Sequence, residues 1–213
     1  MINAYSESYL SDAMKNLGDM VDFAVRQLEY DADEFWDYFI ASGIASRFEK
    51  GNPRFVAGMS GYELTDAVIY ATKEARVDAE PEYVDYKSRE YWAGWVLAYY
   101  QWQTNLRFEE MVQDGLTLSR VLSMYILHEA DISKFVECAN EIILASKAKR
   151  KSNLHTIRKA RGFTQQELSK HSGVSLRMIQ LYEQRQNDIS KAQVSVVMNL
   201  AQSLGCEVKD LLE

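Results

Sequence analysis

The sequence is poor in the residues that interrupt helices and in those that form disulfides. It has 2 Pro and 10 Gly in 213 residues, while apolar residues recur at helical spacing along most of its length. This combination predicts an all-α protein. The 2 Cys, Cys138 and Cys206, lie far apart, each in an apolar helical pattern without a neighbour at metal-ligand spacing. We therefore expect two buried thiols and no metal site.

Long apolar runs and the motifs of common enzymes are also missing. The most apolar stretches, such as 194–198 and 142–145, are far shorter than the roughly 20 residues of a membrane-spanning helix. Residues 1–10 lack the basic-then-apolar order of an export signal, so we expect a cytoplasmic protein without membrane contact. There is no phosphate-binding glycine loop, no metal-spaced His and Cys cluster and no nucleophile motif. The sequence predicts no enzyme, with no catalytic, cofactor-binding or metal-binding residue.

Charge is divided unevenly along the chain. The whole protein has a net charge of −7, but the residues from 147 onward carry 12 Lys and Arg against 6 Asp and Glu, a net of +6. The preceding residues carry 12 basic against 25 acidic groups, a net of −13. A small basic domain attached to a larger acidic one predicts phosphate contact by the first and a different task for the second.

Residues 1–146 are expected to form a helical region. Two helices are marked by capping signals, one from Asp31 to Gly43 and one from Ser60, and 49–61 is the main expected loop. The charged stretch 73–90 contains Pro81 and is typical of a linker or loose crossover that could subdivide the region. Further amphipathic helices are expected after it, ending with 117–127 and 133–145. Residues 147–152 then form a basic hinge, either a solvated linker or an arm that touches phosphates.

Residues 153–213 contain the pattern that points to function. Thr164 is placed to open a helix over 165–172, and Gly173 supplies the positive φ of a tight turn. Val174 fills the corner, and Ser175 caps the next helix. Apolar residues on both sides of the turn, Leu168, Ile179 and Tyr182, are spaced to pack the two helices together. This arrangement is a helix-turn-helix, whose second helix lies in the major groove of DNA.

The segments Phe163–Ser169, Ser172–Ser175 and Ile179–Glu183 together resemble the Cro/phage-repressor (XRE-like) helix-turn-helix family. The resemblance covers about the last sixty residues and implies a five-helix, lambda-repressor-like domain with further helices over 154–161, 191–204 and 208–212. It also implies that Arg158 pairs with Glu183. Ser169 departs from the alanine that is usual in the family, which puts only the packing at that position in question.

The same resemblance implies which residues contact a double-stranded DNA operator. Thr164, Gln165 and Ser175 sit where phosphates pass, and Arg185 and Asn187 are weaker candidates for that role. Arg177 is the expected base reader, because a guanidinium forms two hydrogen bonds with guanine. The other outward residues of the recognition helix are Leu176, Gln180 and Leu181, of which Gln180 suits adenine and Leu176 a thymine methyl. Family members bind inverted repeats as dimers, so we expect a homodimer.

The role of residues 1–146 is less constrained. The segments 35–45 and 51–61 are loosely similar to uncharacterised helical domains of bacterial mobile-element regulators, some of them encoded beside toxin genes. This similarity favours an autoregulating antitoxin whose acidic, aromatic region binds a toxin. The alternative is a stand-alone repressor whose region senses a ligand or dimerises. The many aromatic rings, more than a small core is expected to hide, predict that some lie in an interface.

Overall fold

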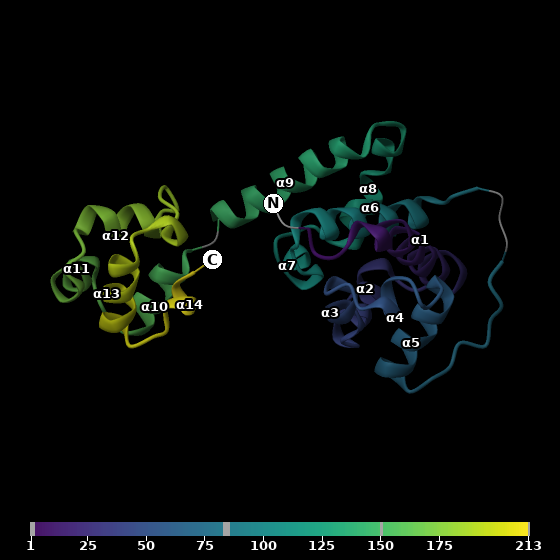
Figure 1. Cartoon of the computed structure of the whole chain (residues 1–213), viewed down its shortest axis with the longest axis horizontal. Helices are drawn as coiled ribbons and strands as arrows, with labels where there is room; N and C mark the ends of the chain where they lie inside the picture. Colours follow the sequence, from purple (N-terminus) through teal and green to yellow (C-terminus); the bar gives the residue numbers. More distant parts are fainter. Residues whose placement is uncertain (1–2, 83–85, 150, 213) are drawn as a thin grey trace. The chain divides into compact units, whose positions relative to one another are not determined.

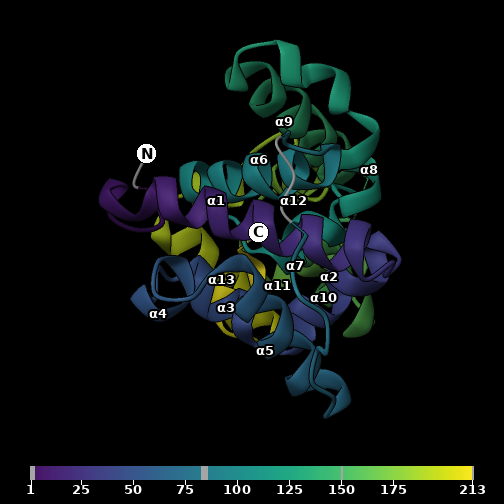
Figure 2. The ribbon, with the colours of Figure 1, turned by 90° about the vertical axis from the view of Figure 1, so that its right-hand side faces the viewer.

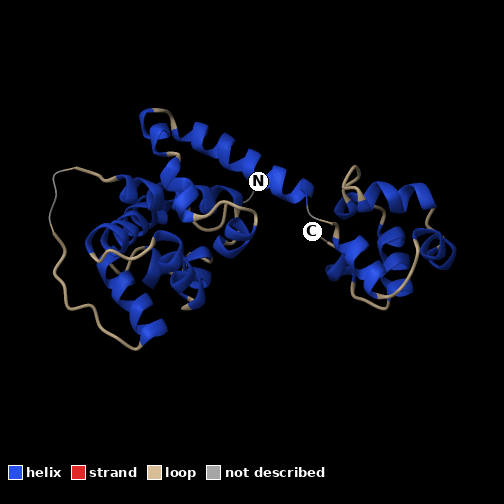
Figure 3. Cartoon of the chain, turned by 180° about the vertical axis from the view of Figure 1, so that it is seen from behind, coloured by secondary structure: helices blue, strands red, loops and turns tan. Residues whose placement is uncertain are grey.

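The structure is a computed structural model that describes residues 3–82, 86–149 and 151–212. All regular elements in these ranges are helical (Figure 3), which confirms the predicted all-α class. No helix in them is long and apolar enough to cross a membrane. The chain forms two compact units, Met1–Leu144 and Ala145–Glu213.

The first unit consists of helices of very unequal length. In chain order these are η1 (Glu7–Tyr9), α1 (Leu10–Val21), the π-helical η2 (Asp22–Gln27), α2 (Ala32–Ala41), α3 (Ile44–Glu49), α4 (Pro53–Val56), α5 (Gly61–Lys73), α6 (Arg89–Thr104), α7 (Phe108–Gln113), α8 (Leu118–Ser123), the 3-10 helix η3 (Tyr125–Glu129) and α9 (Ile132–Lys149). The end of α9, from Ala145, belongs to the second unit.

Two helices at the centre of this unit, α1 and α6, lie side by side (Figures 1 and 2). Glycines let their backbones approach closely. A Cβ on Gly94 of α6 would lie 2.3 Å from the carbonyl oxygen of Leu17, and one on Gly18 of α1 would lie 2.8 Å from the Tyr91 ring. Both positions therefore exclude larger residues, and α1 packs against α5 on another side.

The aromatic residues fill the core of the first unit. Phe108 makes ring contacts with Trp36, Phe39 and Phe48, at centroid distances of 5.3, 5.5 and 6.1 Å. Of the 4 Trp, Trp36 and Trp102 are buried and the other two are half-buried against the core. Other rings of this unit stay accessible, Tyr70 at 50% and Tyr86 at 64% exposure, so the expectation that some aromatic rings lie in an interface stays a prediction.

Several predicted boundaries need correction. The expected loop 49–61 contains α4, which Asn52 caps by accepting a hydrogen bond from the backbone N–H of Arg54. The expected helix 117–127 is split into α8 and η3. Helix α9 extends past residue 145, so 147–149 belong to its last turn rather than to a hinge. In the described part of the predicted crossover no helix forms between α5 and α6, and the segments on both sides of it belong to one unit.

The second unit contains five α-helices in its described residues, in agreement with the family resemblance. They are α10 (Asn153–Ala160), α11 (Gln165–Ser172), α12 (Leu176–Glu183), α13 (Val194–Leu204) and α14 (Val208–Leu211), with the 3-10 helix η4 (Ile189–Lys191) before α13. The expected helix 191–204 thus begins three residues later. Cys206, like Cys138, is half-buried rather than buried, and both thiols are free.

Candidate nucleic-acid interface

The turn between α11 and α12 has the expected geometry. Gly173 ends α11 with a φ of 69°, in the left-handed region that favours glycine. Val174 follows and is only 7% exposed. The hydroxyl of Ser169 donates a hydrogen bond of 2.7 Å to the carbonyl oxygen of Val174. The serine that departs from the family pattern therefore fits, and it fastens α11 to the turn.

Both helices of the motif begin at a hydroxyl cap. Thr164 and Glu167 form a capping box at the start of α11, in which the threonine oxygen accepts from the Glu167 N–H at 3.1 Å. The Ser175 oxygen accepts from the Met178 N–H at 3.3 Å. The Ser175 oxygen acts as an acceptor in its cap, so its hydroxyl can still donate to a phosphate oxygen. The Thr164 hydroxyl also bonds to the Glu167 carboxylate. Both caps are exposed, as phosphate contact requires.

One side of α12 is buried and the other faces outward. Ile179 and Tyr182 are 0% and 6% exposed and belong to the core of the second unit with Leu168. Arg177 is exposed at the second position of α12, whereas the three other expected outward residues are half-buried: Leu176, Gln180 and Leu181. The helix therefore exposes Arg177 more fully than the other three residues.

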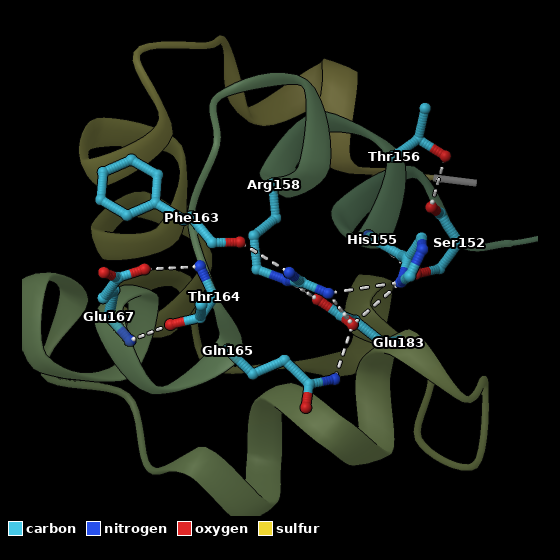
Figure 4. A network of polar contacts seen from close by, with 9 residues as sticks. All are labelled: Ser152, His155, Thr156, Arg158, Phe163, Thr164, Gln165, Glu167 and Glu183. Carbon is cyan, nitrogen blue, oxygen red and sulfur yellow. Dashed lines mark hydrogen bonds and ion pairs between the residues drawn. The ribbon is translucent and has the colours of Figure 1, made fainter.

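A buried ion pair holds this helix in place (Figure 4). The Arg158 guanidinium donates to both oxygens of Glu183, at 2.8 Å from Nη2 to Oε2, and each side chain is 3% exposed. Arg158 also donates to the carbonyl oxygen of Phe163 at 2.7 Å. The pair that the family resemblance implies thus joins α10 to α12 and to the loop before α11.

Two further residues complete this network. Gln165 Nε2 donates to Glu183 Oε2 at 2.8 Å, and His155 Nδ1 lies 3.1 Å from the same oxygen. Gln165, expected to face phosphates, therefore has its amide nitrogen engaged within the domain. His155 is a half-buried partner of Glu183. Nothing in the local sequence indicates this contact, because it depends on how α10 packs against α12.

The network keeps Glu183 ionised. Burial raises the pKa of this carboxyl group, but hydrogen bonds from Arg158, Gln165 and His155 outweigh burial and hold its pKa below the usual range. The hydrogen bonds to Glu183 raise the pKa of Arg158. A charged pair that is fully hydrogen-bonded fixes the orientation of two helices more sharply than apolar contact alone.

The loop after α12 carries the two weaker candidates. Arg185 is half-buried and has a φ of 56°, while Asn187 is exposed and its backbone N–H donates to the carbonyl oxygen of Leu181 at 3.2 Å. The N-termini of α11 and α12 and this loop belong to one small domain. They provide hydroxyl, amide and guanidinium donors of the kind that contact DNA phosphates and bases.

The comparisons with known proteins agree with this geometry. Residues 154–211 match the family model described as helix-turn-helix. No curated protein and no solved structure matches the chain. The C-terminal region is therefore a helix-turn-helix domain of the Cro/phage-repressor type, the kind found in DNA-binding transcription regulators.

Proposed function

We propose that this protein is a sequence-specific transcriptional regulator that binds its operator through α12. The observation that carries this proposal is that Arg177 is exposed on the recognition helix α12. The buried ion pair between Arg158 and Glu183 attaches this helix to the rest of the domain. A guanidinium presented at the start of such a helix can contact guanine in the major groove, while Thr164 and Ser175 contact the flanking phosphates.

The proposed binding form is a homodimer on an inverted repeat. One domain of this size covers a half-site, and a second copy adds a second recognition helix about one DNA turn away. On α13, Val194 and Met198 are one helical turn apart and are 73% and 56% exposed. Apolar side chains this exposed gain free energy when covered, and we propose that a second copy covers them.

The finer role we propose is that of an autoregulating antitoxin-type repressor, whose region 1–146 binds a toxin or another partner protein. Its net charge of −13 disfavours DNA contact and suits a partner with a basic surface. Two apolar side chains of the first unit are available for such contact, Ile126 at 72% exposure and Leu144 at 66%. Its segments also resemble those of regulators encoded beside toxins.

A second candidate is a stand-alone repressor whose first unit senses a small ligand. The observation that favours it is a pocket of about 600 Å³ within the first unit, a volume in the range of known small-molecule sites. The two candidates share the DNA-binding domain and differ only in what the first unit binds.

The DNA-binding proposal is tested by selecting operators for the purified full chain from random duplex DNA. We expect an inverted repeat to be enriched. The Arg177→Ala variant should lose preference at one position of each half-site, by about 1–3 kcal/mol between the best base and the others. Lys209 is an exposed cation on α14 paired with Glu207, and Lys209→Ala serves as the charge-matched control that leaves the preference intact.

The Gln165→Ala variant distinguishes contacts that position the protein on DNA from contacts that recognise a base. We expect it to weaken binding to all sequences by a similar factor, because phosphate contacts fix the register of the protein without selecting a base. Equal, sequence-independent losses from Arg177→Ala and Gln165→Ala would contradict the proposed orientation of α12. Circular dichroism of each variant checks that the domain remains folded, since Gln165 also bonds to Glu183.

A further inference from the structure

The pocket of the first unit is formed by elements that are distant in sequence. Helix α5 contributes one wall, η2 and the region of α4 contribute others, and crossover residues 76–79 close a side. Asp66 of α5 anchors that crossover, because its carboxylate accepts from the Arg76 guanidinium and, at 3.0 Å, from the backbone N–H of Val77. The crossover wall of the pocket is thus attached to α5 by hydrogen bonds to Asp66 as well as by the polypeptide chain.

Aromatic rings and charged groups line this pocket together. Phe23 is buried and supports the Tyr62 ring, which it meets edge to face with ring centroids 5.1 Å apart. Tyr70 is 50% exposed, and the Arg76 guanidinium lies 4.0 Å from its ring centroid. Planar, apolar surfaces flanked by hydrogen-bonding groups are the usual composition of a small-molecule site.

Of the charged side chains that line the pocket, we assign the Arg54 guanidinium to ligand binding. Asp66 is used by Arg76, and the Glu63 carboxylate accepts from the backbone and side chain of Ser60 in the capping box of α5. Arg54 is exposed, lies over the Phe55 ring at 5.7 Å and makes no ion pair with any residue in the described ranges. Its guanidinium is therefore the charged group that a ligand can engage.

Tyr62 contributes its ring to this pocket rather than its hydroxyl. The residue lines this pocket and also a neighbouring one, which Asp19 and Asp22 line with it. Burial, assisted by the charges of Asp19 and Asp22, raises the pKa of Tyr62. An anion is therefore better placed at Arg54 than at the Tyr62 hydroxyl, which is close to two carboxylates.

We propose that this pocket binds a small organic anion with an aromatic ring system, whose rings lie against Tyr62 and Tyr70 and whose anionic group pairs with Arg54. Both acids of the pocket already have partners, so they repel such an anion less than free carboxylates do. Binding here does not depend on the DNA-binding function of the second unit. It would make the first unit a ligand-responsive module.

The test uses two fluorescent probes with the same ring system and the full-length protein. The aromatic anion 8-anilinonaphthalene-1-sulfonate is compared with N-phenyl-1-naphthylamine, which lacks the sulfonate. We expect saturable binding of the sulfonate at one site per chain. Arg54→Gln should weaken it about tenfold, the effect of losing a charged hydrogen bond, and leave the affinity for the neutral amine unchanged.

Arg47→Gln is the matched control, because Arg47 also lies over the Phe55 ring, at 5.6 Å, but does not line the pocket. It should leave both affinities intact. Ala67→Phe places a ring in the pocket and should abolish binding of both probes, with circular dichroism verifying the fold. The proposal is overturned if the sulfonate fails to bind at a single site, if Arg47→Gln and Arg54→Gln weaken it equally, or if the cationic dye thioflavin T binds more tightly.

Discussion

At the scale of single residues, the Arg158–Glu183 pair has the clearest energetic consequence. Arg158→Met leaves a buried carboxylate without its main partner, so we expect a loss of about 3–5 kcal/mol in the unfolding free energy of the second unit. The exposed neighbour Lys159 gives the control, since Lys159→Met should change stability by no more than about 0.5 kcal/mol.

The two units can be followed separately in this experiment. All 4 Trp lie between residues 36 and 102, so tryptophan fluorescence reports only the first unit. Circular dichroism at 222 nm reports both. We expect Arg158→Met to lower the melting temperature of a transition seen by circular dichroism. The melting temperature of the transition seen by fluorescence should not change. A variant that melts at the wild-type temperature by both signals would show that the pair contributes little.

Glu183 also makes stability depend on pH. Its pKa in the folded state is lowered from the ordinary 4.5, so its contribution is present above pH 4.5 and is lost as pH falls toward the folded pKa. The difference in melting temperature between the wild type and Glu183→Gln should therefore be largest near neutral pH and shrink below pH 4.5. A difference that stays constant from pH 7 to pH 3 would contradict this assignment.

At the scale of elements, the turn between α11 and α12 requires glycine because of its backbone conformation, not because a side chain lacks room there. A Cβ on Gly173 would meet nothing within 4 Å, but the φ of 69° is unfavourable for other residues. We expect Gly173→Val to destabilise the second unit by about 1–2 kcal/mol. Gly173→Asn should cost less, because asparagine adopts this conformation more readily. Thermal unfolding followed by circular dichroism compares the two, and equal losses would mean that conformation is not the cause.

The same turn explains how much of the site could be predicted from the sequence. The residues that shape the turn act on the backbone within three residues of themselves: Thr164, Gly173 and Ser175. Their roles can therefore be predicted from the local sequence. The contact of His155 with Glu183 joins residues 28 apart in the chain. It depends on tertiary packing, which no local pattern encodes.

Two of the corrected boundaries lie outside the helix-turn-helix domain and follow from local signals that favour a helix. Asn52 followed by Pro53 is a favourable cap and first residue for a helix, and it opens α4. Residues 147–149, Lys-Ala-Lys, have high helix propensity and extend α9, although their charge suggested a hinge. The large aromatic core could not be anticipated, because it is assembled from α2, α3, α6 and α7.

At the scale of the whole molecule, the apolar surface of α13 predicts the oligomeric state. Met198→Glu places a charge on the proposed contact between copies, and we expect it to raise the dissociation constant of the dimer at least tenfold, since a buried Met contributes about 1.5–3 kcal/mol. Asn199→Glu adds the same charge at an adjacent exposed position and is the control. Sedimentation equilibrium measures both. If the wild-type protein is monomeric at all concentrations, the proposed interface on α13 is wrong.

The last prediction concerns the independence of the first unit. Helix α9 extends to Lys149, and the hydroxyl of Ser152 caps α10 by accepting from the His155 N–H at 3.1 Å. A fragment of residues 1–151 therefore keeps α9 whole and leaves the cap with the second unit. We expect this fragment to fold with the tryptophan emission of the full chain, because the aromatic core is complete within it.

The same fragment should fail to bind the operator, since it lacks the helix-turn-helix and carries 25 acidic residues that repel phosphates. In cells that contain the complete native locus, it should copurify with the product of the neighbouring gene. The separately expressed second unit is the control and should bind DNA without that partner. If the fragment is folded yet copurifies with neither a second copy nor the neighbouring product, the antitoxin-type role is wrong, and the ligand-responsive repressor becomes the better description of how the acidic unit serves the DNA-binding one.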